Sequence, residues 1–163
     1  MEADLNVRDL KWDEIVHLER FLYDAIYIPP GSAKPDKLII KIPELITYIK
    51  DFGKDSDLCL VAEINGKLIG AIWAREFPEN ERGFAYVDDK TPELSMSVDE
   101  NHRNSGIGTK LMIKMIERLK NLNYEQVSLS VNKLNYAFRM YLKFGFEEVR
   151  SDETSAIMVK KLK

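Results

Sequence analysis

The sequence predicts a single α/β domain over residues 1–163 with a mixed sheet, and three observations lead to this expectation. Asn65-Gly66 separates two runs rich in β-formers, which is the strongest short-range signal for a hairpin. A strand, a turn and a helix then follow one another between Glu93 and Leu122. The same succession recurs between Val127 and Gly145, so the expected order of elements is β-α-α-β-β-β-α-β-α-β-β.

Size and composition agree with one compact domain that folds without disulfides or a structural metal. The chain has 163 residues, of which 45% are apolar and 31% charged, an ordinary balance for a globular protein. A chain of this length buries roughly two-thirds of the surface that its unfolded form exposes. The net charge of -3 gives no reason to expect nucleic acid as a partner.

The cysteine content and the N-terminus favour a cytoplasmic location. Cys59 is the one cysteine and lies in an apolar run, so we expect a buried hydrophobe and a reducing compartment. The segment Met1–Leu5 is acidic and lacks the apolar core of a signal peptide. No apolar stretch approaches the ~20 residues that cross a bilayer, so no membrane partner is expected.

The N-terminal third predicts one strand and two helices. A short strand is expected at Leu5–Arg8, followed by a helix at Trp12–Ile26, where apolar residues recur every three or four positions. The prolines and glycine of 28–32 begin a long loop. A second helix is expected from Pro43 to about Phe52, with Gly53 as its C-terminal stop.

The central part predicts strands and then the longest helix. The hairpin strands are expected at Leu58–Ile64 and Leu68–Trp73. A short strand is an option at Phe84–Val87, and Glu93–Val98 alternates as a clear one. The helix that follows the turn at 99–105 places its apolar residues on one stripe. The stripe comprises Ile107, Leu111, Met115, Leu119 and Leu122.

The C-terminal part predicts three strands and a helix. The first strand is Val127–Val131, and the helix Tyr136–Phe144 ends at Gly145. Two strands at Phe146–Val149 and Ala156–Val159 close the chain.

The turn between Val98 and Thr109 is the segment that points most directly to a ligand. A helix begins there at two closely spaced glycines, Gly106 and Gly108. The first turn of a helix presents unpaired amides and about half a positive charge, and glycines let a bulky phosphate come close to them. Arg103 adds a cation at the mouth of the turn.

Two familiar phosphate motifs do not fit this turn. A P-loop requires an upstream glycine and the order Gly-Lys-Ser/Thr, whereas Gly108 is followed by Thr109 and Lys110. A dinucleotide fingerprint requires a third glycine where Leu111 stands, and it opens a βαβ unit.

A third pattern, Arg/Gln-x-x-Gly-x-Gly/Ala, fits Arg103-Asn104-Ser105-Gly106-Ile107-Gly108, and here the sequence resembles the GNAT superfamily of N-acetyltransferases. Taken alone, the hexapeptide also suits any helix start with two glycines. A second block adds specificity because it matches the GNAT pattern Asn-x-Ala-x-x-x-Tyr-x-x-x-Gly-Phe. Its matching residues are Asn135, Ala137, Tyr141, Gly145 and Phe146. Asn104 and Ser105 depart from many relatives, which have glycine or a basic residue there.

The resemblance implies a GNAT-like fold, with a mixed, mostly antiparallel sheet flanked by helices, and acetyl-CoA as cosubstrate without a metal. It implies that the turn holds the CoA pyrophosphate and that strand 94–98 lies along the pantetheine arm. A bulge in this strand would free an amide near Val98 for the thioester carbonyl. The cofactor contacts expected from the resemblance are Met96, Ser97, Val98, Arg103, Asn104, Ser105, Gly106, Ile107, Gly108, Thr109, Asn135 and Tyr141.

Two residues are the catalytic candidates. The family's tyrosine at the position of Tyr141 donates a proton to the departing CoA thiolate, so Tyr141 is the expected general acid. Glu93 is the best local base for the amine, although an exposed carboxylate at a strand edge and a water chain are alternatives. Asp88 and Asp89 are secondary candidates. Asn135 also suits a plain helix cap, and Tyr141 suits a core tyrosine.

Residues around these candidates suggest further roles. The acidic loop 76–93 could attract a cationic amine, although charge runs usually form a solvated face. Trp73, Phe84 and Tyr86 could line an acceptor pocket or pack in the core. His17 and His102 have no partner pattern that suggests a metal site.

The sequence thus predicts an acetyl-CoA-dependent N-acetyltransferase that moves an acetyl group to a small-molecule or peptide amine by direct attack. The alternative is a non-catalytic module that binds or senses acyl-CoA. An α/β interaction domain without a nucleotide site would leave both sequence blocks as coincidence. Relatives are often dimers, so a homodimer stays open, and the sequence does not identify the acceptor.

Overall fold

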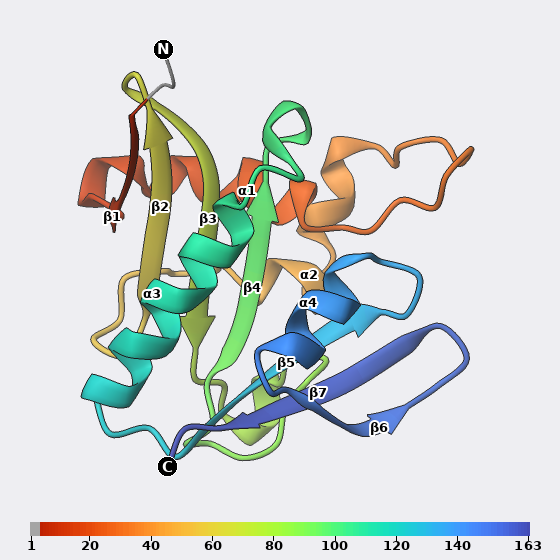
Figure 1. Cartoon of the computed structure of the whole chain (residues 1–163). Coiled ribbons are helices and arrows are strands. Elements are labelled where there is room, and N and C mark those ends of the chain that lie inside the picture. Colours follow the sequence, from red (N-terminus) through yellow and green to blue (C-terminus); the bar gives the residue numbers. More distant parts are fainter. Residues whose placement is uncertain (1–3) are drawn as a thin grey trace.

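One seven-stranded sheet organises residues 4–163, which are the part of the chain that the computed structural model describes (Figure 1). The strand order is β1-β2-β3-β4-β5-β7-β6, and each neighbouring pair is antiparallel except the parallel pair β4–β5. The expected mixed, mostly antiparallel sheet is therefore confirmed. The strands are β1 (Leu5–Asp9), β2 (Leu58–Ile64), β3 (Lys67–Arg75), β4 (Glu93–Val98), β5 (Gln126–Asn132), β6 (Glu147–Ser151) and β7 (Ser155–Lys161).

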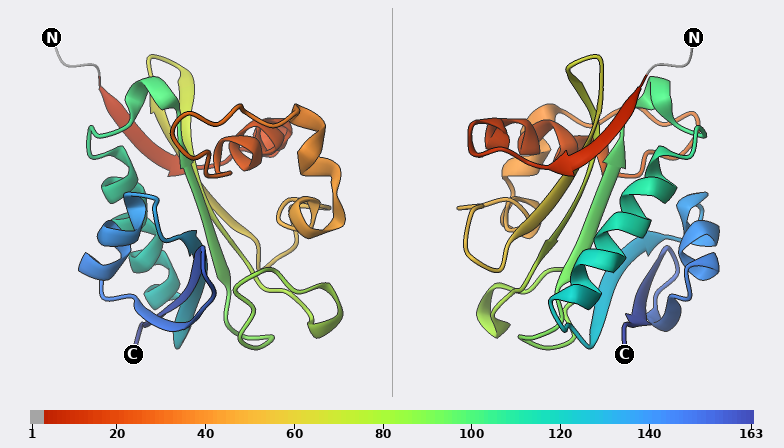
Figure 2. Two further views of the ribbon diagram at one scale, coloured as in Figure 1. Left: turned by 90° about the vertical axis from the view of Figure 1, so that its right-hand side faces the viewer. Right: turned by 60° about the vertical axis from the view of Figure 1, so that its left-hand side comes forward.

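Helices cover both faces of the sheet, as Figure 2 shows in its edge-on view. The α-helices are α1 (Leu18–Asp24), α2 (Pro43–Ile46), α3 (Ile107–Asn121) and α4 (Ala137–Lys143). The 3-10 helices are η1 (Trp12–His17), η2 (Lys37–Lys41), η3 (Glu79–Glu81) and η4 (Glu100–His102). The order of strands and α-helices along the chain is the predicted one. The start of the chain, on which the signal-peptide prediction rests in part, lies outside the described residues for positions 1–3.

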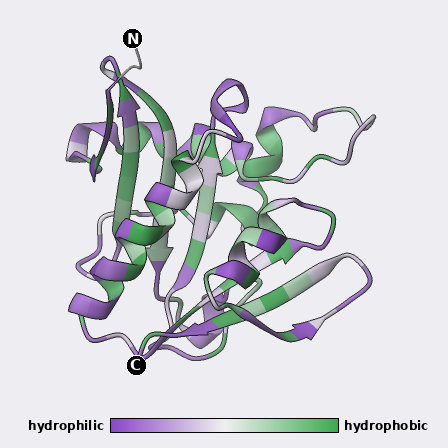
Figure 3. Cartoon of the chain, in the orientation of Figure 1, coloured by the Kyte–Doolittle hydropathy of each residue, from purple (hydrophilic) through white to green (hydrophobic). Residues whose placement is uncertain are grey.

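Two hydrophobic clusters hold the layers together. One joins the sheet to α3 and α4, with Leu111, Met115 and Tyr141 among its buried members. The other joins the opposite face to α1 and the segment around α2, with Phe21 and Trp73 fully buried. Figure 3 shows the corresponding apolar colouring along the strands and on one side of α3. Leu122, expected on this buried stripe, lies beyond the end of α3 and is half exposed.

The hairpin is confirmed at its predicted place between β2 and β3. Asn65 and Gly66 both have positive φ angles, 51° and 78°. Positive φ at both central positions is the requirement of the tight turn that matches the twist of paired strands. Asparagine and glycine are the residues that adopt it at least cost, which is why this dipeptide predicted the turn.

The first predicted helix begins differently from the expectation. Residues 12–17 form the 3-10 helix η1, and the α-helix α1 begins only at Leu18 and ends at Asp24. The amide of Glu14 bonds to the carbonyl of Lys11 at 2.9 Å, which is a three-residue step. Glu14 also binds the guanidinium of Arg8 in β1 at 2.8 Å, so the tight first turn is tied to the sheet.

The second helix is shorter than predicted because tertiary contacts take its carbonyl groups. The α-helix α2 ends at Ile46, and turns continue to residue 51. The Thr47 carbonyl accepts a hydrogen bond from Arg75 at 2.9 Å, and the Tyr48 carbonyl accepts one from Trp73 at 3.1 Å. Both donors come from β3, so these carbonyls face the sheet. Gly53 therefore does not serve as the helix stop.

The short strand suggested at Phe84–Val87 is wrong. The amide of Phe84 donates to the hydroxyl of Tyr48 at 2.8 Å, and the amide of Ala85 donates to the carboxylate of Glu93 at 3.0 Å. Side chains thus occupy the backbone groups that a neighbouring strand would need. The segment becomes a loop held against the start of β4.

The parallel strands β4 and β5 pair at one point and then separate. Their register contains the single pair Glu93 and Ser128, and the amide of Ser128 donates to the carbonyl of Pro92 at 3.0 Å. Beyond this point the two strands diverge toward α4, as Figure 1 shows. The divergence leaves one side of β4 without a neighbouring strand.

No helix within residues 4–163 combines the length and apolar character needed to cross a membrane.

Candidate functional site

The turn before α3 holds its backbone amides open. Asn104 and Gly106 have positive φ angles of 60° and 82°, and α3 begins at Ile107 without a side-chain cap. Within the described residues, no hydrogen bond is made by the backbone amides from Asn104 to Thr109. Unpaired amides at a helix start, together with the helix dipole, form an anion-binding surface. The predicted helix start is confirmed, and its amides are free of side chains.

The two glycines of the turn have different structural reasons. Gly106 needs its left-handed backbone conformation, which other residues adopt at a cost. Gly108 has no such need, and a Cβ atom there would meet only Met96 Cε at 3.5 Å and two sulfur atoms beyond it. Packing within the protein therefore does not require glycine at position 108. The absence of a side chain there leaves the neighbouring amides accessible to a ligand.

A cavity of about 480 Å³ lies between this turn and α4. Three basic side chains line it: Arg103 from the turn, and Arg139 and Lys143 from α4. Arg103 donates its Nε to the carbonyl of Val98 at 3.0 Å, which folds the side chain over the end of β4. The cavity combines cations with open amides, which suits a phosphate group.

Arg139 and Lys143 were not predicted as site residues. A sequence signal exists, because Tyr136, Arg139, Met140 and Lys143 are spaced as one face of a helix and all line this cavity. The helix itself was predicted, but which of its faces lies against the turn before α3 depends on how α4 packs.

A larger cavity of about 700 Å³ occupies the gap between β4 and β5. Residues 93–96 of β4 and 129–132 of β5 form its two strand walls. Asn135 and Tyr141 line it from the α4 side. Two catalytic candidates, Glu93 and Tyr141, thus meet in one cavity although they are far apart in the sequence.

Backbone groups of β4 face this gap. The amide of Asp99 donates to the carbonyl of Ile69 at 2.7 Å, and the register between β3 and β4 is unbroken from Glu93 to Val98. Because hydrogen-bonding direction alternates along a strand, Met96 and Val98 direct their amides away from β3. The structure has no bulge in this strand, so the bulge that the resemblance implied is wrong here. The divergence of β5 opens the amides instead.

Ser97 occupies the opposite register position. Alternation turns its backbone toward β3, where the ladder continues. Its hydroxyl is buried and has no hydrogen-bond partner within residues 4–163. The backbone of Met96 and Val98 thus fits the expected ligand contact, whereas that of Ser97 belongs to the sheet.

Tyr141 is buried against the sheet and lines the larger cavity. Its side chain is 8% exposed, and its ring packs on Phe146 with 5.8 Å between centroids. No described residue forms a hydrogen bond with its hydroxyl group. Burial raises the pKa of Tyr141 above its ordinary value, so the phenol holds its proton at neutral pH.

Glu93 is buried rather than exposed at a strand edge. The residue is 2% exposed, and its Oε1 accepts hydrogen bonds from the Tyr48 hydroxyl and the Ala85 amide. Its Oε2 is buried without a partner within residues 4–163. Burial raises the pKa of Glu93 to about 7, against the lowering effect of the hydrogen bonds from Tyr48 and Ala85.

Sequence reasoning missed the residues that hold Glu93. Tyr48 comes from the segment after α2, and its hydroxyl group donates a hydrogen bond to Glu93 and accepts one from the amide of Phe84. At Gly83 a Cβ atom would lie 2.0 Å from Oε2 of Glu93, so only glycine lets the loop lie against the carboxylate. Neither residue belongs to a local motif, so only the folded chain reveals them.

Asn135 combines both roles considered for it. Its Oδ1 accepts the amide of Ala137 at 3.0 Å at the start of α4. Its side-chain nitrogen makes no hydrogen bond to a described residue, and the residue lines the larger cavity. The amide nitrogen is thus available to a ligand.

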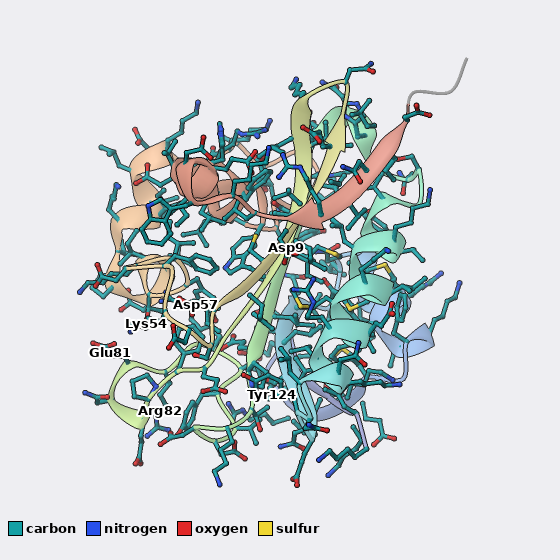
Figure 4. The ribbon with its side chains drawn as sticks, turned by 90° about the vertical axis from the view of Figure 1, so that its left-hand side faces the viewer. Asp9, Lys54, Asp57, Glu81, Arg82 and Tyr124 are labelled. Atoms are coloured by element: carbon teal, nitrogen blue, oxygen red, sulfur yellow. The ribbon has the colours of Figure 1, made fainter. Side chains whose placement is uncertain are left out.

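The acidic loop contributes little to either cavity. The residues of this loop that line the larger cavity are Phe84 and Glu93. Glu76 binds Tyr124, and Figure 4 shows the labelled Glu81 and Arg82 at the edge of the molecule, away from α3. Asp88 and Asp89 bind Thr91 and Tyr86, respectively.

Other candidates lie outside the cavities or in the core. Trp73 is fully buried, and Cys59 is buried with a pKa raised by the loss of water. His102 lines the smaller cavity beside Arg103. Within the described part of the chain, no three His, Cys, Asp or Glu side chains gather to hold a metal ion.

Comparisons with known proteins agree with this geometry. A family model described as the acetyltransferase (GNAT) family matches residues 12–146. No curated protein matches the chain in a sequence search.

Solved structures with the same fold are numerous, and three illustrate the range. An N-acetyltransferase from Staphylococcus aureus Mu50 has a TM-score of 0.71 at 20% identity, with 99% of this chain and 100% of that chain covered. The ribosomal-protein-S18-alanine N-acetyltransferase from Escherichia coli has a TM-score of 0.67 at 15% identity, with 98% of this chain and 94% of that chain covered. The PaiA N-acetyltransferase from Thermoplasma acidophilum, in complex with coenzyme A, has a TM-score of 0.67 at 19% identity, with 97% of this chain and 99% of that chain covered.

Proposed function

The chain belongs to the acetyltransferase (GNAT) family, and we propose that it transfers an acetyl group from acetyl-CoA to an amine. One observation carries this proposal. The backbone amides at the start of α3 have no partner within residues 4–163, and they open into a cavity lined by Arg103, Arg139 and Lys143. Such a site suits the pyrophosphate of CoA.

The residues present fit CoA along its length. The open amides from Asn104 to Thr109 would hold the pyrophosphate, and Gly108 leaves room for it. The amides of Met96 and Val98 face the gap beside β4, where an extended pantetheine arm can bond as an added strand would. The structural neighbour from Thermoplasma acidophilum binds coenzyme A, which supports the same assignment here.

The larger cavity supplies groups for acetyl transfer. Glu93 would accept the proton of the amine as its nitrogen attacks the thioester carbonyl, and an amide of β4 would stabilise the oxyanion. As the carbon–sulfur bond breaks, Tyr141 would donate its proton to the departing CoA thiolate. The products are the acetylated amine and CoA, with no covalent intermediate on the protein.

Calorimetry with CoA tests the proposed site. We expect Gly108→Trp to abolish CoA binding, because an indole at this position fills the space beside the open amides. Glu117→Trp, on the exposed side of the same helix, is the matched control and should bind CoA normally. Full CoA affinity in Gly108→Trp would refute the site.

A panel of amines with detection of free thiol then separates the enzyme from a non-catalytic acyl-CoA-binding module. Release of CoA that depends on the amine supports the enzyme. Tight CoA binding without such release would favour the module. A cytoplasmic location and a homodimer stay expectations from the sequence.

A further inference from the structure

The larger cavity contains a cation close to the proposed base. Arg150 of β6 lines the cavity together with Glu93, and its charge lowers the pKa of Glu93. Among the described residues that line this cavity, Arg150 is the one basic side chain. No carboxylate within residues 4–163 lies at ion-pair distance from its guanidinium group.

A β-bulge places Arg150 in the cavity. Glu148 pairs with Met158 of β7, but Arg150 pairs with Ile157, so Val149 is an extra residue on β6. Residues directly opposite in a ladder share a face, and Ile157 lines the cavity whereas Met158 is in the core. In a regular ladder Val149 would oppose Ile157. The bulge therefore exchanges an apolar side chain for a cation, which is a known use of bulges beside active sites.

The guanidinium of Arg150 keeps donors available. Its Nη2 makes long hydrogen bonds to the carbonyls of Phe84 and Tyr86, at 3.4 and 3.3 Å. Its Nε and Nη1 make no hydrogen bond to a described residue. The fork of an arginine matches a carboxylate through two parallel hydrogen bonds. A second carboxylate of the wall belongs to Asp152, and its Oδ1 accepts the amides of its own turn, at Thr154 and Ser155.

Apolar side chains form another part of the cavity wall. Leu22, Ala25 and Ile26 line it from the end of α1, and Leu45 and Phe84 line it beside Tyr48. A ligand that fits all these groups has an ammonium for Glu93, a carboxylate for Arg150 and an apolar body. We propose that the acceptor is a small amine that carries a carboxylate, as in an apolar α-amino acid, and that Arg150 selects it. This proposal rests on the acetyltransferase function proposed above.

Matched acceptors test the proposal. L-leucine, L-methionine and L-phenylalanine are compared with their amides and their decarboxylated amines, in assays of CoA release at saturating acetyl-CoA. We expect kcat/KM to be at least about 10-fold higher for the amino acids, because the amides and decarboxylated amines lack the carboxylate and lose its charge-assisted contact with Arg150.

Variants of Arg150 assign the preference to this residue. Arg150→Gln should lower kcat/KM for the amino acids roughly 10- to 100-fold, mainly through KM, and leave the amides unchanged. Arg150→Lys keeps the positive charge but lacks the two parallel donors, so its kcat/KM for the amino acids should lie between those of Arg150→Gln and the unmodified protein. Lys161→Gln, an exposed lysine of β7, is the control and should behave as the unmodified protein.

Each contrary result is distinct. Equal kcat/KM for acids and amides, or no turnover of any carboxylate-bearing amine, overturns the proposal. A loss in Arg150→Gln that is equal for acids and amides also overturns it, because it shows that Arg150 only holds the loop at Phe84 and Tyr86. Calorimetry with CoA reports separately on the proposed function, which fails if the unmodified protein does not bind CoA.

Discussion

At the scale of single residues, the carboxyl group of Glu93 shows how burial prepares a group for proton transfer. Loss of water raises its pKa to about 7, while hydrogen bonds from Tyr48 and Ala85 act in the opposite direction. A carboxyl group with a pKa near the working pH is both available as a base and able to release the proton afterwards. Its Oε2 is buried without a partner among the described residues and lies against Gly83.

The pH dependence of activity follows from this pKa. We expect kcat/KM to rise as pH increases through about 7, because only the ionised form of Glu93 accepts a proton. Glu93→Gln should remove this limb of the profile and lower kcat roughly 10²- to 10⁴-fold. Rates measured from pH 5 to 9 check both effects, and an unchanged profile in Glu93→Gln would exclude Glu93 as the base.

Tyr141 is the second residue whose surroundings decide its chemistry. Burial keeps its phenol protonated, and its hydroxyl has no protein partner among the described residues. We expect Tyr141→Phe to lower kcat roughly 10²- to 10⁴-fold with little change in CoA affinity, because the ring and its packing on Phe146 remain. Turnover and calorimetry measure the two quantities. Tyr124→Phe, which loses a hydroxyl group bound to Glu76, is the control and should turn over normally. Normal turnover in Tyr141→Phe would exclude Tyr141 as the general acid.

At the scale of elements, the two glycines at the start of α3 differ in role, one serving the fold and the other the proposed binding of CoA. Gly106 has a φ of 82°, which a side chain disfavours, whereas Gly108 stands inside the first helical turn with ordinary space around it. The first glycine thus serves the backbone. The second leaves the amides accessible.

Alanine at each position tests this division. Gly106→Ala should destabilise the fold by about 1–2 kcal/mol, the cost of a left-handed conformation with a side chain. Gly108→Ala should not destabilise the fold, because alanine has a higher helix propensity than glycine, but the variant should bind CoA more weakly. Urea denaturation and calorimetry measure the two effects. Unchanged CoA affinity in Gly108→Ala would mean that the glycine does not serve the ligand.

At the scale of the whole molecule, the sheet divides where β4 and β5 part. The single paired position, Glu93 with Ser128, sits at the narrow end of the gap, and α4 closes the wide end. One half of the molecule contributes the open edge of β4 and the other contributes Asn135 and Tyr141. A ligand in this gap contacts both halves, so binding stabilises the fold as a unit.

Thermal unfolding measures this coupling. A concentration of CoA 100 times its Kd should add about 2.7 kcal/mol to the free energy of unfolding. For a domain of this size the melting temperature should rise by about 5–10 °C. Gly108→Trp should show no such rise, and a full rise in this variant would place CoA elsewhere.

The sequence predicted the parts of the fold that depend on local chemistry. Asn65-Gly66 identified the hairpin because few residues adopt positive φ, and Gly145 marked the end of α4 for the same reason. The strand at Glu93–Val98 and the start of α3 at Ile107 were also predicted correctly, and both border the site.

Predictions failed where tertiary contacts compete with local hydrogen bonds. The α-helix α2 ends early because Arg75 and Trp73 take carbonyls that a longer helix would use. The strand suggested at Phe84–Val87 does not form because Tyr48 and Glu93 take its amides. No local pattern announces these donors and acceptors, since they come from distant segments.

By itself the sequence determined the order of elements, the turn at Arg103–Gly108 that is proposed to bind phosphate, and the pairing of that turn with Asn135 and Tyr141 in the family pattern. The tertiary structure alone decided that Glu93 is buried, that Tyr48 and Gly83 hold it, and that Arg150, beside a bulge in β6, lines the same cavity. The physical reason is range. Backbone conformation and helix starts depend on neighbouring residues, whereas a pKa and a cavity wall depend on groups that only folding brings together.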